Sequence, residues 1–105
     1  MRAKIARNPD GTRLAVIRCP GCNDVHHVPV DGPRKWGFNE SLSRPTFTPS
    51  VIVRGTATDQ DDPDAKALEF TCHFIVTDGR IAYCSDSTHA LSGQAVDLPE
   101  FSWEA

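Results

Sequence analysis

Residues 69–86, EFTCHFIVTDGRIAYCSD, decide the fold. Two runs rich in β-branched and aromatic residues flank the pair Asp78-Gly79, which favours a two-residue type I′ turn. We therefore expect a β-hairpin in which Thr77 lies opposite Arg80. The segment is the clearest local signal in the chain, and it indicates an antiparallel sheet.

The register of this hairpin brings polar residues together. Counting back from the turn places His73 opposite Cys84. The same count places Thr71 opposite Asp86, so that His73 and Asp86 are diagonal neighbours on one face. A carboxylate at that position can hydrogen-bond an imidazole and orient it. We therefore predict a histidine–aspartate dyad.

A serine can join this dyad. If strand 50–54 pairs symmetrically with residues 69–73, Ser50 lies directly opposite His73. A hydroxyl nucleophile, an imidazole base and an orienting carboxylate are the parts of a serine hydrolase. Two alternatives stay open. In one, Ser87 is the nucleophile with His89 or His73 as base; in the other, His73, Asp86 and His89 hold a catalytic metal.

The rest of the chain predicts a mainly β fold, a small antiparallel sheet in one domain over residues 1–105. Eight prolines and seven glycines cut the 105 residues into short pieces, which leaves little room for helix. We expect an ordered loop over 31–49, a solvated acidic loop at 58–66 and one helical turn near 87–93. The further strands that we expect are 13–18, 25–30, 50–54 and a short one within 94–101.

Cys19-Pro-Gly-Cys22 lies in the turn between strands 13–18 and 25–30 and has the spacing of a zinc knuckle. A closed zinc site needs two further ligands, and the candidates are His26, His27, Cys72, His73, Cys84 and His89. We predict a structural Zn²⁺ held by Cys19, Cys22, His26 and Cys72. A redox role is less favoured, because redox CxxC motifs usually open a helix after a strand.

Composition limits the partners and the compartment. The net charge of −3 gives no basic field for nucleic acid. No apolar stretch reaches the roughly 20 residues of a membrane helix, and none near the start has the form of a signal peptide. We therefore expect a cytoplasmic protein without membrane or nucleic-acid partners.

The runs WGFNESLSRPTFTPSVIV and CHFIVTDGRIAYCSDSTHALSGQAVDLP resemble a family of short phage and bacterial proteins of unassigned function. Members often carry the label "ammonia monooxygenase", which does not suit a chain without membrane spans. Glu40 departs from the family pattern, which commonly has glycine there, and position 87 holds serine or cysteine in the family. The positions that match are Cys19, Cys22, His26, Trp36, Asn39, Pro45, Thr46, Phe47, Pro49, Ser50, Cys72, His73, Asp86, His89, Gly93 and Gln94.

Some relatives resemble proteins encoded beside bacterial ubiquitin-like proteins and their conjugation enzymes. This resemblance implies a processing or deconjugating peptidase. The matching polar residues also exceed what one zinc site needs. Our first hypothesis is therefore a serine-type peptidase that acts on the C-terminus of a ubiquitin-like protein. The alternatives are a metallohydrolase and a non-catalytic zinc-knuckle module that binds a protein through residues 31–49 or a sheet edge.

Overall fold

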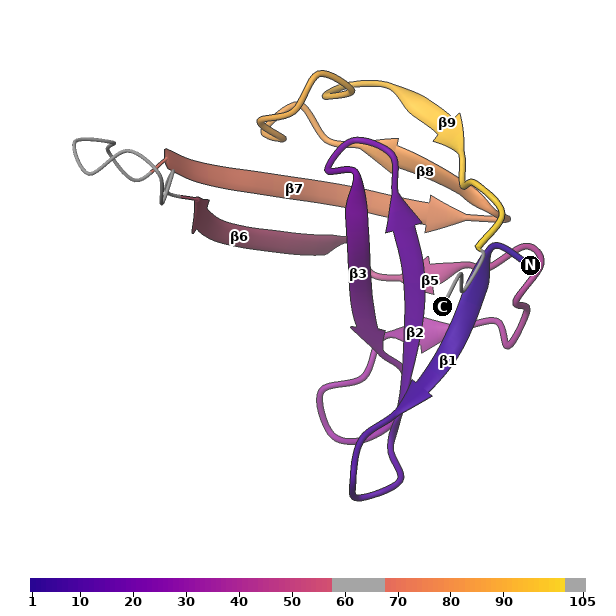
Figure 1. Ribbon diagram of the computed structural model, residues 1–105. Helices are drawn as coiled ribbons and strands as arrows, with labels where there is room; N and C mark the ends of the chain where they lie inside the picture. Colours follow the sequence, from indigo (N-terminus) through magenta and orange to yellow (C-terminus); the bar gives the residue numbers. More distant parts are fainter. Residues whose placement is uncertain (58–67, 102–105) are drawn as a thin grey trace.

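The computed structural model describes residues 1–57 and 68–101. These residues form strands and turns without a helix, and the strands make three antiparallel sheets (Figure 1). The predicted mainly β, antiparallel class is confirmed. The first sheet has the order β1-β2-β3, the second β4-β5 and the third β6-β7-β8-β9. Their bounds are β1 Ala3–Arg7, β2 Arg13–Cys19, β3 Asp24–Pro29, β4 Gly37–Phe38, β5 Phe47–Thr48, β6 Val51–Ala57, β7 Leu68–Thr77, β8 Arg80–Tyr83 and β9 Ala95–Asp97.

The hairpin β7–β8 forms at the expected turn. Thr77 pairs with Arg80, and both turn residues have positive φ, 51° at Asp78 and 79° at Gly79, as a type I′ turn requires. The backbone N–H of Cys84 donates to the carbonyl oxygen of His73 at 2.8 Å, which confirms that these two residues are opposite each other.

Beyond Cys84 the predicted register is wrong. The chain turns at Ser85 and Asp86, so Thr71 meets Thr88 instead of Asp86. The N–H of Thr88 donates to the carbonyl of Thr71 at 2.9 Å. This turn takes the place of the last rungs of the expected hairpin.

The predicted pairing of β6 with β7 occurs, but its register differs from the symmetric one. Ile52 pairs with His73, whereas the symmetric register assigned Ser50 to that place. Ser50 lies just before β6 and is therefore displaced by two residues along the sheet. The acidic loop at 58–66 lies outside the described residues, and the pairing across it is long-range.

Three further differences concern short elements. β1 pairs with β2 and was not expected, because AKIAR has one β-branched residue and alternates over only its first three residues. Within the predicted loop 31–49, Phe38 pairs with Phe47 in the small β4–β5 sheet, and their rings stack with centroids 5.4 Å apart. The segment 87–93 forms bends and turns, whereas a helical turn was expected.

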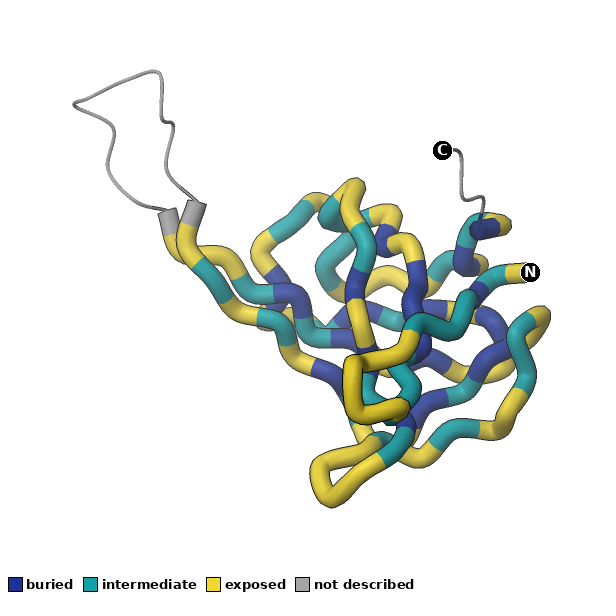
Figure 2. The backbone as a smooth tube through the Cα atoms, turned by 60° about the horizontal axis from the view of Figure 1, so that its bottom comes forward, coloured by how far each residue is buried: buried dark blue, intermediate teal, exposed yellow. Residues whose placement is uncertain are grey.

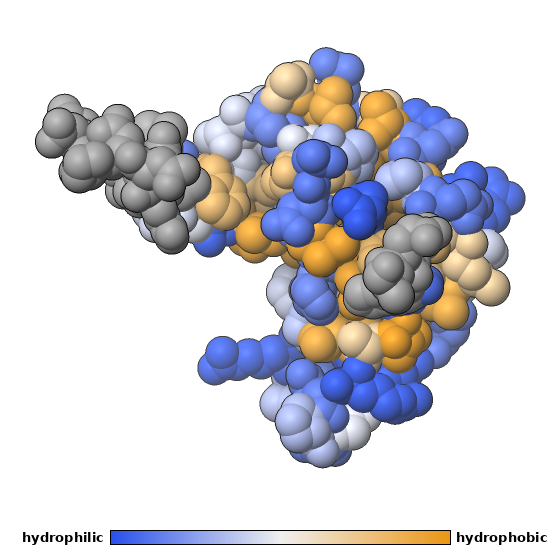
Figure 3. All heavy atoms as spheres, viewed as in Figure 1, coloured by the Kyte–Doolittle hydropathy of each residue, from blue (hydrophilic) through white to orange (hydrophobic). Residues whose placement is uncertain are grey.

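The core lies where the first and third sheets cross. Buried residues gather in the middle of the backbone trace in Figure 2. On the face of the molecule that Figure 3 shows, apolar residues lie among hydrophilic ones. The largest fully buried aromatic and aliphatic side chains include Ile17, Phe47, Phe74 and Ile81. Burial of each contributes about 1.5–3 kcal/mol. None of the described residues forms a helix that is long and apolar enough to cross a membrane.

Candidate functional site

Ser50, His73 and Asp86 form one chain of polar contacts. The Oγ of Ser50 lies 3.1 Å from Nε2 of His73, and Nδ1 of the same ring lies 3.1 Å from both carboxylate oxygens of Asp86. A hydroxyl, an imidazole and a carboxylate thus follow one another in the order in which a serine hydrolase uses them. The three residues meet although the register that suggested their meeting differs in detail.

Three separate elements position these side chains. Ser50 precedes the first residue of β6, and its carbonyl oxygen accepts a hydrogen bond from Nε1 of Trp36 at 3.2 Å. His73 lies on β7, and Asp86 lies in the turn after β8. The turn that replaces the expected end of the hairpin carries the carboxylate back to the imidazole.

Ser87, the alternative nucleophile, is buried and its hydroxyl contacts the backbone of His73. The residue is only 7% exposed. Its Oγ accepts a hydrogen bond from the backbone N–H of His73 and donates one to the carbonyl of His73, each at 3.0 Å. Both contacts engage the hydroxyl, so Ser87 fastens the turn to the backbone of His73.

The polar chain is open to solvent on one side. The side chain of His73 is 27% exposed and that of Asp86 is 52% exposed. A groove of about 590 Å³ begins at Asp86 and follows β6 and β7. Its lining residues are Arg54, Gly55, Thr56, Glu69, Phe70, Thr71 and Asp86. Asp86 belongs both to this groove and to the polar contacts with His73.

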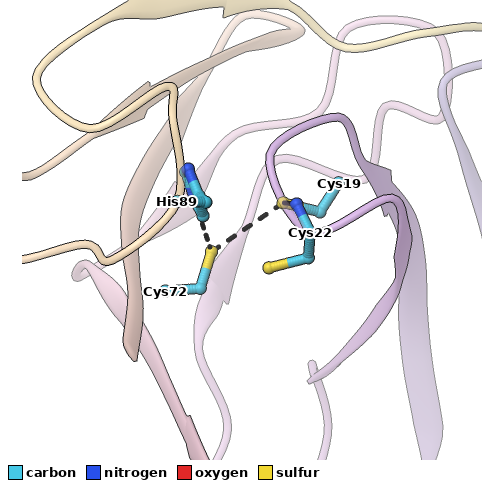
Figure 4. A group of neighbouring side chains, drawn as sticks. All are labelled: Cys19, Cys22, Cys72 and His89. Atoms are coloured by element: carbon cyan, nitrogen blue, oxygen red, sulfur yellow. Dashed lines mark hydrogen bonds between the residues drawn. The ribbon is translucent and has the colours of Figure 1, made fainter. Parts of the chain in front are cut away.

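A second cluster lies on the other side of β7. It contains Cys19 at the end of β2, Cys22 in the following turn, Cys72 on β7 and His89 in the turn after β8 (Figure 4). One ligand atom from each residue lies within 4.8 Å of the other three, so a single metal ion could be bound by all four. The cluster joins the CPGC turn to β7 and to the turn that follows β8.

Hydrogen bonds hold this cluster together. The sulfur of Cys72 lies 3.8 Å from that of Cys19 and 3.4 Å from Nε2 of His89. The hydroxyl of Tyr83 lies 3.0 Å from the Cys19 sulfur and accepts the N–H of Gly21 at 3.1 Å. These contacts arrange the sulfurs and the imidazole around one point (Figure 4).

The thiols influence one another electrostatically. The hydrogen bond with Cys72, helped by those with His26 and then Tyr83, lowers the pKa of Cys19 against the opposing effect of burial. The same contact and burial raise the pKa of Cys72. Burial, followed by the charge of Cys19, raises the pKa of Cys22. Three thiolates at this separation repel one another, and a bound divalent cation would offset that repulsion.

The fourth member of this cluster is His89, where we expected His26. The ring of His26 stacks on Phe74 with centroids 5.4 Å apart, because β3 directs it into the core opposite Ile17. Within residues 1–57 and 68–101, His89 groups with the three cysteines, and the alternative set of His73, Asp86 and His89 does not appear as a metal cluster.

Gly21 provides a test of the cluster. A Cβ at this position would lie 2.6 Å from both ring nitrogens of His89, and the ring also packs edge-on against Tyr83. Gly21→Ala is therefore expected to displace His89 and to weaken metal binding by on the order of 10–100-fold. Competition with a chelator measures the affinity. Pro20→Ala, at the exposed neighbouring position, is the control, and equal affinities for the two variants would contradict the arrangement.

One family model matches more than half of the polypeptide. Residues 2–84 match the model of a family described as the bacterial ubiquitination-like system serine protease (BubE). The chain belongs to this family. The match includes Ser50 and His73 and ends before Asp86 and His89. No curated protein and no solved structure matches the chain. The BubE family name supports a hydrolase that acts on protein in a ubiquitination-like system.

Proposed function

We propose that this protein is a serine peptidase in which Ser50 is the nucleophile, His73 the general base and Asp86 the orienting carboxylate. The observation that carries the proposal is the pair of contacts made by the His73 ring, one to the Ser50 hydroxyl and one to the Asp86 carboxylate. Membership of a serine protease family supports it. The contacts of Ser87 within the fold favour a positioning role for that residue.

The geometry suggests the following sequence of steps. Ser50 Oγ attacks the scissile carbonyl carbon while Nε2 of His73 accepts the hydroxyl proton. Asp86 accepts a hydrogen bond from Nδ1–H, which keeps the free lone pair on Nε2 and stabilises the imidazolium. His73 then donates its proton to the leaving amine, and an acyl-enzyme on Ser50 remains. Water, activated by the same imidazole, hydrolyses the ester and restores Ser50.

The substrate that we propose is the C-terminal tail of a bacterial ubiquitin-like protein. β6 is an outer strand of the third sheet as described, and Ser50 lies immediately before it. An extended tail can pair with such an edge and bring a carbonyl to the serine. The family name supports a protein substrate of a ubiquitination-like system.

We further propose that the metal at the cysteine cluster is Zn²⁺ with a structural role. Three thiolates and one imidazole form a closed tetrahedral set that zinc favours. The segment that supplies His89 also carries Asp86 and Ser87, so a metal at the cluster would fix the turn that holds the carboxylate. No step of the proposed peptidase reaction uses this metal.

Asp86→Asn tests the assigned roles. An amide can donate to Nδ1 and stabilise the wrong tautomer of His73, so kcat is expected to fall by about 10²–10⁴-fold. The measurement is cleavage of a C-terminally extended ubiquitin-like protein from the same system. Asp97→Asn is the control, because Asp97 is exposed on β9 and pairs with Arg80. Unchanged cleavage by the Asp86→Asn variant would contradict the role of Asp86.

A further inference from the structure

Cys84 lies beside the proposed catalytic residues and has no role in the steps above. The ligand atoms of His73, Cys84 and Asp86 lie within 4.8 Å of one another. The backbone hydrogen bond between Cys84 and His73 fixes this neighbourhood. Cys84 is half-buried and its thiol is free. The exposed carboxylate of Asp86 leaves a path for a cation from solvent.

These three side chains offer a sulfur, a nitrogen and an oxygen, which are all zinc ligands. Three protein ligands with one side open to water are the arrangement of an open zinc site, whereas the cluster of three cysteines and His89 is closed. We propose that His73, Cys84 and Asp86 form a second metal site, which binds Zn²⁺ reversibly and inhibits the peptidase. The inhibition, unlike the binding itself, rests on the proposed function.

The inhibition follows from where the protons lie. Nδ1 is the nitrogen of His73 that faces Asp86, so a cation shared with the carboxylate takes the Nδ1 lone pair. The ring proton then resides on Nε2, which faces Ser50 Oγ at 3.1 Å. A protonated Nε2 cannot accept the serine proton, and the carboxylate is engaged by the cation. Binding releases the thiol proton of Cys84 to solvent.

The test compares the zinc-containing protein with its Cys84→Ala variant. Native mass spectrometry during a Zn²⁺ titration is expected to show two bound ions for the parent chain and one for the variant. Loss of one of three ligands should weaken the second site by more than about tenfold. In parallel, saturating Zn²⁺ is expected to slow fluorophosphonate labelling of the parent chain by more than about tenfold and to leave the variant unaffected. Mg²⁺ serves as the ionic control.

Each other result has a distinct meaning. One bound ion in the parent chain, or two in the variant, would overturn the site. Faster cleavage of the extended ubiquitin-like protein in the presence of Zn²⁺ would overturn the proposed inhibition and favour a metallohydrolase. If a second ion binds through Cys84 but fluorophosphonate never labels the protein, the metal site stands. The proposed inhibition and the proposed serine peptidase activity are then both wrong.

Discussion

Ser50→Ala is expected to lower peptidase activity by at least about 10³-fold while the fold stays intact, because the variant has no nucleophile and activity without one comes from binding alone. The Ser50 hydroxyl makes one part-buried hydrogen bond, to Nε2 of His73. Its loss should therefore change the free energy of unfolding by only about 1 kcal/mol. Cleavage of an extended ubiquitin-like protein measures the first quantity, and thermal unfolding measures the second.

Ser43→Ala is the matched control for this experiment, because Ser43 is an exposed serine of the same segment. Its activity is expected to equal that of the parent chain. Activity of the Ser50→Ala variant within about tenfold of the parent would remove Ser50 from the proposed reaction. It would then favour the module that only binds a protein, or another nucleophile.

Cys72→Ala is expected to abolish binding of the structural metal and most of the stability. Cys72 is fully buried and lies between Cys19 and His89. Structural zinc contributes apparent binding free energies of about 10–16 kcal/mol in small zinc domains. This is of the same size as the roughly 5–15 kcal/mol by which a typical domain is stable. Metal content and thermal unfolding of the purified protein measure the two effects.

Cys84→Ala serves as the control for that loss, since Cys84 lies outside the closed cluster. With one equivalent of zinc it should retain the metal and the unfolding temperature of the parent chain. A Cys72→Ala variant that keeps its zinc and melts at the parent temperature would contradict the structural site. Chelation of the parent chain should reproduce the effect of Cys72→Ala.

Local sequence signals predicted the central hairpin well. The turn at Asp78-Gly79 determines which residues pair, and the pairing holds as far as Cys84. The β2–β3 hairpin around the CPGC turn is equally local and forms at 13–19 and 24–29, within one residue of the expectation. In both hairpins the residues of the turn determine the strand register, because a short turn leaves few alternative registers.

Long-range pairing could not be predicted in the same way. The register between β6 and β7 depends on packing across the core, and a symmetric loop was only one of several possibilities. The proposed triad survives the difference because Ser50 lies before the strand, where its side chain reaches His73 diagonally. The sequence therefore indicated which residue types form the triad. The fold determines how close the Ser50 hydroxyl lies to the His73 ring.

His89 was among the candidate zinc ligands, but His26 was preferred to it for a related reason. His26 is close to the knuckle in sequence, but the strand directs its ring onto Phe74. His89 reaches the cysteines only because the chain turns after β8. The glycine at position 21 is consistent with a histidine ligand packed against the knuckle, since a residue without a Cβ leaves space there for the ring.

The most direct measurement of the central claim is the site of a covalent adduct. The purified protein is treated with a fluorophosphonate, and the modified residue is located by peptide mass spectrometry. We expect one adduct on Ser50, absent from the Ser50→Ala variant and strongly reduced in the His73→Ala variant. An adduct on Ser87 instead, or none on a folded chain that cleaves its substrate, would contradict the assignment of Ser50.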